Sequence, residues 1–195
     1  TIPREVTKIG DGAFACLANL EYINIESGSE LVSIGYRAFS CSRKLKQVVL
    51  PRFNSKLTTI GVSAFSHCLS LQKINLEDSP LISIENDAFY NTALSFVYLP
   101  QTLQTIGEYA FSAAPESNQT YANMLVLVFA ESGALKHIGK AAFRGQSMLA
   151  SVAFPASLET IGASAFSMLG APPPVSDGFL LSEGVTFQGT NLLSI

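Results

Sequence analysis

Cysteine and histidine side chains are the groups in this sequence best suited to metal binding, redox chemistry or nucleophilic catalysis. They stand at Cys16, Cys41, Cys68, His67 and His137 of 195 residues. The cysteines are spaced by 25 and 27 residues, whereas the close ligand pairs of structural zinc sites are roughly two to five residues apart. We therefore assign no metal and no cofactor. We interpret the cysteines as small, buried, reduced side chains, with a disulfide as the alternative.

Two sequence features suggest enzyme chemistry, but both lack the groups that would complete a site. His67 and Cys68 are adjacent, yet a cysteine nucleophile needs a base oriented by a third group and an oxyanion site within a cleft. Lys140 follows a glycine, as in a phosphate-binding loop, but Ala134 and Ala141 replace the required glycine and the magnesium-binding hydroxyl. We therefore predict that the chain is not an enzyme.

Composition and charge exclude two classes of partner. The formal net charge is −3, the pI is about 5.4 and lysine and arginine form no cluster, so the sequence lacks the basic surface that nucleic acids require. The longest uninterrupted apolar run, residues 124–130, is much shorter than the roughly 20 residues that cross a bilayer. We expect no nucleic-acid partner and no transmembrane segment in this sequence.

One hexapeptide, Ile-Gly-x-x-Ala-Phe, recurs along the chain. Its seven copies occupy residues 9–14, 34–39, 60–65, 84–89 (with Glu85 in place of glycine), 106–111, 138–143 and 161–166. Their phenylalanines are separated by 25, 26, 24, 22, 32 and 23 residues, the period of leucine-rich repeats. The three cysteines follow a repeat phenylalanine by two or three residues, so we expect them to face inward together. A unit this short cannot bury its own apolar face, so the units must stack.

An alternating apolar segment follows each of the first six hexapeptides and predicts a β-strand. The six copies resemble Leu-x-x-Ile-x-Leu and occupy residues 20–25, 45–50, 71–76, 94–99, 124–129 and 149–154. Period-two apolar residues bury one face of a strand, and Pro51, Pro100 and Pro155 end three of these segments. Stacking yields one parallel sheet, with right-handed coiling from strand twist and crossover rules. On the opposite face, Ile-Gly-x-x-Ala-Phe-x-x-Cys predicts short helical or irregular segments.

These units resemble the BspA-type leucine-rich repeats, whose unit reads Leu-Pro-x-x-Leu-x-x-Ile-Gly-x-x-Ala-Phe-x-x-Cys-x-x-Leu-x-x-Val-x-Leu-Pro. A representative copy spans residues 51–76, with matches at Pro51, Leu57, Ile60, Gly61, Ala64, Phe65, Cys68, Leu71, Ile74 and Leu76. The resemblance covers nearly the whole chain and implies a leucine-rich-repeat solenoid. It further implies a surface or secreted protein of bacteria or protists that adheres to host or matrix proteins.

We expect a single array over residues 1–195, with about seven repeats. Residues 192–195 resemble the start of another repeat and neither end has a polar cap, which indicates a fragment of a longer array. Insertions at 112–123 and 167–184 interrupt the period and predict surface loops that could contact a partner. Asn118 lies in the first insertion and matches the N-glycosylation pattern Asn-x-Ser/Thr, although so short a pattern also arises by chance.

Two outward-facing positions flank the central apolar residue of each predicted strand. Down the stack they form two ladders, which are Tyr22, Gln47, Lys73, Phe96, Val126, Ser151 and Asn24, Val49, Asn75, Tyr98, Val128, Ala153. The middle of the face is apolar, so we predict a protein-binding patch of Phe96, Tyr98, Val126 and Val128, with Tyr22 and Asn24 on the same face. The alternative is that the 112–123 insertion covers this patch.

The function predicted from these features is non-catalytic protein–protein recognition or adhesion, at the cell surface or outside the cell. The partner would be a protein, either an extracellular-matrix protein or another subunit of an assembly. The alternative is a structural subunit docked within a large multiprotein assembly, which the 48% hydrophobic content also suits.

Overall fold

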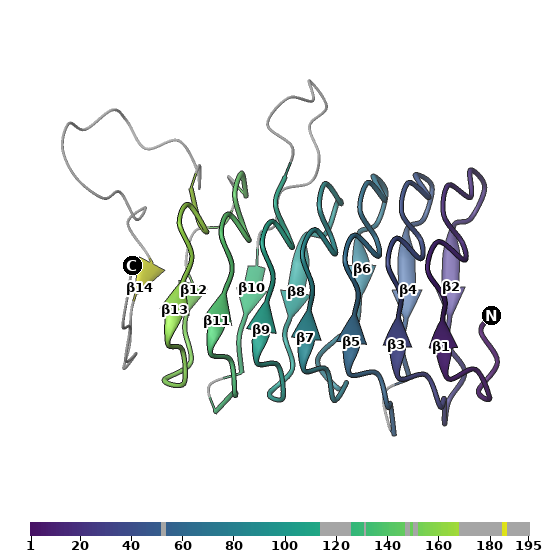
Figure 1. The fold of residues 1–195 in the computed structure, drawn as a ribbon, viewed down its shortest axis with the longest axis horizontal. Helices are drawn as coiled ribbons and strands as arrows, with labels where there is room; N and C mark the ends of the chain where they lie inside the picture. The colour runs from purple at the N-terminus through teal and green to yellow at the C-terminus, as the bar shows by residue number, and fades with distance from the viewer. Residues whose placement is uncertain are drawn as a thin grey trace.

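A computed structural model describes residues 1–51, 54–113, 126–130, 132–146, 149, 152–167 and 185–186 of the chain. These residues form a parallel β-solenoid, in which the chain winds through successive circuits and each circuit stacks on the one before it (Figure 1). Each circuit, called a rung below, adds a short strand to one or both of two columns. The described residues contain no helix.

The first column is a continuous seven-stranded parallel sheet. Its strands, in spatial order, are β1 (Lys8–Ile9), β3 (Ser33–Ile34), β5 (Thr59–Ile60), β7 (Ser83–Ile84), β9 (Thr105–Ile106), β11 (His137–Ile138) and β13 (Thr160–Ile161). Each isoleucine of the hexapeptide is aligned with the isoleucine of the next rung, as Ile34 is with Ile60. The sequence repeat therefore sets the register of this sheet, because a slip would turn the isoleucines out of the core.

The second column is divided into three short parallel sheets. They are β2 (Tyr22–Asn24) with β4 (Gln47–Val49) and β6 (Lys73–Ile74), then β8 (Phe96–Tyr98) with β10 (Val126–Val128), then β12 (Val152–Ala153) with β14 (Val185–Thr186). The six strands from β2 to β12 lie where the apolar alternation predicts them. Among the described residues, pairing stops between β6 and β8 and again between β10 and β12, so the expectation of one continuous sheet is wrong there.

The expectation of helical segments opposite this column is also wrong. The residue two before each repeat phenylalanine has a φ between 50° and 63°, a left-handed conformation that stops a right-handed helix. Successive backbone amides of this segment then donate in turn to a carbonyl of the same rung and to a carbonyl of the next rung. Ala38 donates to Gly35 within its own turn, whereas Phe39 donates to the Ala64 carbonyl of the next rung at 2.8 Å. The right-handed coiling of the array stays a prediction.

The repeat phenylalanines form the centre of the core. Phe14, Phe39, Phe65, Phe89, Phe111, Phe143 and Phe166 stack with ring centroids 5.0–5.3 Å apart and interplanar angles of 2–12°. Leucines and isoleucines of both strand columns surround these rings. The predicted inward ladder of phenylalanines is confirmed, and each ring stacks on the ring of every adjacent rung in the ladder.

Candidate protein-binding site

The outer surface of the β8–β10 pair carries large apolar side chains. Phe96 is 49% exposed, Tyr98 47% and Val128 39%, whereas Val97 and Leu127 between them are buried. Parallel pairing aligns Val126 with Phe96 and Val128 with Tyr98, so the four side chains adjoin on one face. We call Phe96, Tyr98, Val126 and Val128 the apolar patch. Strand alternation explains it, because the inward positions of both strands are already filled by core residues.

Tyr22 and Asn24 lie on the same face but away from the apolar patch. They belong to β2, which β4 and β6 separate from β8. Tyr22 is exposed and lies beneath Lys46, whose Nζ is 5.8 Å from the ring centroid and 2.8 Å from Glu21. The hydrogen bond that Lys46 donates to Glu21, together with the negative charge of Glu21, raises the pKa of Lys46. This end of the face is therefore polar and charged, and the structure does not join it to the apolar patch.

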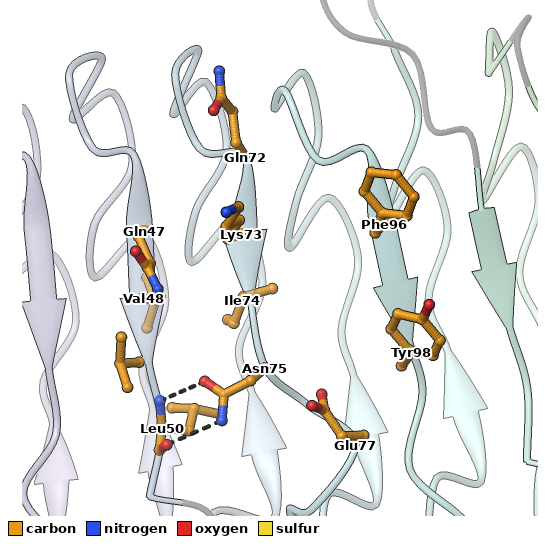
Figure 2. Close-up of a pocket in the computed structure, with 11 residues that line it drawn as sticks. Gln47, Val48, Leu50, Gln72, Lys73, Ile74, Asn75, Glu77, Phe96 and Tyr98 are labelled. Atoms are coloured by element: carbon orange, nitrogen blue, oxygen red, sulfur yellow. Dashed lines mark hydrogen bonds between the residues drawn. The ribbon is translucent and has the colours of Figure 1, made fainter.

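A groove lies between the two parts of the face, where pairing stops between β6 and β8. It encloses about 490 Å³, and its lining includes Gln47, Val49, Gln72, Lys73, Ile74, Asn75, Glu77, Phe96 and Tyr98. Figure 2 shows Phe96 and Tyr98 on one strand and Lys73, Ile74 and Asn75 on the neighbouring segment. The apolar patch thus continues into a groove with charged and amide groups.

The side chain of Asn75 replaces a backbone hydrogen-bond partner where the ladder between β4 and β6 ends. In the other parts of the column the amide after the strand donates to a main-chain carbonyl, as Ile25 does to Val49 and Leu99 does to Val128. The Leu50 amide instead donates to Asn75 Oδ1 at 2.8 Å, and Asn75 Nδ2 donates to the Leu50 carbonyl at 3.0 Å. A side-chain amide has replaced the backbone partner, which ends the β4–β6 ladder.

The structure corrects the expected burial of the cysteines. Cys68 is buried, but Cys16 is exposed and Cys41 is only partly buried, and all three are free thiols. Cys16 and Cys41 occupy a position with φ of 57° and 60°, two residues after the phenylalanine, and His67 occupies that position in the third repeat. Cys68 comes one residue later and points inward, where its Sγ donates to the Phe39 carbonyl at 3.1 Å. Burial raises the pKa of its thiol to about 12.

The histidines have structural partners. His67 Nδ1 lies 3.1 Å from Asn91 Nδ2, and the ring meets Tyr90 edge-on at 5.3 Å. Burial lowers the pKa of His67, and the charge of Arg43 lowers it further. His137 Nδ1 lies 2.9 Å from Thr160 Oγ1 on the next rung. Within the described part of the chain, no group of three histidine, cysteine or acidic side chains could hold a metal ion.

Several predicted features lie outside the described residues. Asn118 is one of them, and so is most of both insertions, since the described ranges stop at 113, two residues into the first, and at 167, the first residue of the second. Their roles as a glycosylation site and as contact loops stay predictions. In the part of the chain that is described, no helix is long and apolar enough to cross a membrane.

A parallel β-solenoid with one exposed apolar face is a repeat scaffold that presents side chains on a rigid surface. The model of the BspA type leucine-rich repeat region matches residues 1–118 and 117–171 in six copies, so the chain belongs to that family. A search among curated proteins finds no match.

Solved structures of three bacterial proteins are similar to this chain. A leucine-rich cell surface protein from Faecalibacterium prausnitzii has 27% identity and a TM-score of 0.64 over 84% of this chain and 40% of its own. The T. pallidum leucine-rich repeat protein has 26% identity and a TM-score of 0.60, over 83% and 69%. A leucine-rich repeat protein from Bacteroides ovatus has 26% identity and a TM-score of 0.52, over 85% and 47%. This chain spans less than half of the first and third proteins.

Proposed function

We propose that this chain is a non-catalytic protein-recognition module and that the apolar patch is its contact surface. The observation that carries the proposal is the adjacency of Phe96, Tyr98 and Val128, all more than a third exposed, on two hydrogen-bonded strands. Contiguous exposed apolar surface usually marks an interaction site. Aromatic side chains held on a rigid sheet lose little conformational entropy when they bind, which makes them effective anchors.

The proposed setting is adhesion or recognition at the cell surface or outside the cell, with an extracellular-matrix protein as the partner. Family membership supports this setting, as does the F. prausnitzii relative, which is described as a cell surface protein. The whole array of residues 1–195 would act as a single binding domain, and it would need no cofactor.

A structural subunit within a large assembly is the second candidate, and the distribution of exposed apolar side chains favours it. Exposed apolar residues also occur away from the patch, at Leu17, Val32, Tyr36 and Ile82. A subunit wedged among neighbours would bury several faces, whereas an adhesion module would use one. The two candidates therefore differ in which faces must stay intact for binding.

The double variant Phe96→Ser with Val128→Ser tests the proposal. A matched control, Val32→Ser with Tyr36→Ser, removes one aromatic and one aliphatic side chain of similar exposure, 44% and 45%, from elsewhere on the surface. Binding of each variant to a panel of purified extracellular-matrix proteins, immobilised on a sensor, would be compared with the wild type. We expect the patch variant to weaken binding by about thirtyfold, the effect of losing a hot-spot residue, and the control to bind normally.

The two candidates and the failure of both can be told apart. Equal loss of binding in the patch variant and the control would favour the assembly subunit. A large drop in melting temperature without selective loss of binding would show that the patch belongs to the core. Similar binding by all three proteins would refute the patch as the contact surface.

A further inference from the structure

The groove beside the apolar patch has opposite charges at its two ends. Lys73 lies on β6 and Glu77 lies beyond the end of that strand, and both side chains line the groove (Figure 2). Both residues are exposed, and among the described residues neither forms an ion pair within 4 Å. The groove thus presents one unpaired cation and one unpaired anion.

Three other lysines of the solenoid pair with an acid on an adjacent rung. Lys46 pairs with Glu21 of the preceding rung, Lys56 with Glu30 and Lys136 with Glu159. Lys73 differs because its aligned neighbour on β4 is the neutral Gln47. No acid on the preceding rung therefore neutralises Lys73 in the way that Glu21 neutralises Lys46.

The part of the groove between the two charges is mainly apolar. Ile74 and Val49 contribute aliphatic surface, and the rings of Phe96 and Tyr98 stand along β8. Asn75 also lies there, but its amide is occupied by the two hydrogen bonds to Leu50. A ligand that fills the groove would need an apolar centre with an acidic group at one end and a basic group at the other.

Resting on the protein-recognition function above, we propose that the groove binds an extended peptide segment of the partner with the pattern acid, x, apolar, x, base, read in either direction along the peptide. Alternate residues of an extended chain point to the same side, so the first, third and fifth residues all face the groove. Lys73 and Glu77 are themselves four positions apart, which limits their backbone separation to about 14 Å, the reach of four residues. Five peptide residues span the same distance.

Synthetic peptides about seven residues long test this proposal. Each has leucine at the centre and charged residues two positions to either side, in the four combinations acid–base, base–acid, acid–acid and base–base. Binding would be measured by fluorescence anisotropy. We expect the wild type to bind both mixed-charge peptides about threefold to fivefold more tightly than the like-charged ones, as a solvent-exposed ion pair allows.

Single charge reversals should change this selectivity in opposite directions. Lys73→Glu should prefer the base–base peptide, and Glu77→Lys should prefer the acid–acid peptide. Replacing the central leucine of the peptide by serine should weaken binding to every variant. Lys140→Glu and Glu108→Lys introduce the same changes of net charge at exposed positions outside the groove lining, so they should keep the wild-type preference.

Three outcomes would overturn the proposal: no peptide binding by the wild type, a preference unaltered by the groove variants, or an equal change in the control variants. The outcome is separable from that of the proposed function. Peptide affinity can depend on the groove charges while the double variant Phe96→Ser with Val128→Ser still binds matrix proteins normally. In that case the groove inference stands and the patch proposal fails. The reverse result would support the apolar patch as the contact surface and refute the groove as a peptide site.

Discussion

The side chain of Asn75 is joined to the backbone of Leu50 by two hydrogen bonds, of 2.8 and 3.0 Å, across adjacent rungs. This pair lies where the ladder between β4 and β6 ends, and both residues line the groove between β6 and β8. A single amide side chain thus both ends a ladder and satisfies the backbone groups that the ladder would have paired.

Asn75→Ala should destabilise the protein, because it leaves the amide and carbonyl of the buried Leu50 without their partners. We expect a loss of about 1–3 kcal/mol in the free energy of unfolding, measured by urea denaturation. Asn24→Ala is the matched control, since Asn24 occupies the equivalent position on β2 and is exposed. Equal effects of the two variants would show that the hydrogen bonds to Leu50 contribute nothing.

Phe65→Ala should be among the most damaging substitutions, because Phe65 is fully buried between Phe39 and Phe89. A cavity of this kind costs about 3–5 kcal/mol. Phe14→Ala should cost clearly less, because Phe14 is partly exposed and, among the described residues, stacks only on Phe39. Urea unfolding measures the loss of unfolding free energy in both variants. A smaller loss for Phe65→Ala than for Phe14→Ala would contradict the conclusion that the phenylalanine ladder is the core.

Gly61→Ala should destabilise the fold, whereas Gly10→Ala should not. A Cβ at Gly61 would lie 2.8 Å from the Ile34 carbonyl oxygen of the preceding rung, while at Gly10 no atom lies within 4 Å. Crowding against a fixed backbone costs about 1–3 kcal/mol. The melting temperatures of the two variants test this prediction. Equal values would mean that adjacent rungs can move apart to accommodate the added methyl group.

The three thiols should react in order of exposure. Cys16 should be labelled by a disulfide reagent at once, Cys41 more slowly, and Cys68 only after unfolding, because its thiol is buried and its pKa is raised to about 12. Mass spectrometry after timed labelling of the native protein assigns each site. Rapid modification of Cys68 would show that the rungs open locally.

Acidification should destabilise the wild type more than His67→Asn. Burial lowers the pKa of His67 below its usual 6.5, so the neutral ring stabilises the fold above that pH. This contribution is lost as the pH falls through the folded-state pKa. Asparagine tolerates the left-handed φ of 60° at this position. Urea unfolding at about pH 7.5 and about pH 5 measures the difference, and parallel losses in both proteins would exclude His67 as the cause.

The sequence by itself determined the period, the stacking and the identity of the core ladder. Seven phenylalanines at nearly constant spacing can be buried together only if successive units stack in register, because a unit this small has no interior of its own. The strands of the second column follow from period-two alternation, and the outward positions of Phe96 and Val128 follow from the same pattern.

Tertiary structure decided those features for which the local sequence pattern is compatible with two conformations. Apolar residues at offsets of zero, four, five and eight suit a helical turn as well as a strand followed by a tight turn, and hydrogen bonds to the next rung selected the second. Asn24 and Asn75 occupy the same position of the repeat, yet only Asn75 bonds through its side chain to the preceding rung. Cys41 and Cys68 differ by one position after the repeat phenylalanine, and this left Cys41 partly exposed and buried Cys68 in the core. Each outcome depends on contacts between rungs, which no single repeat contains.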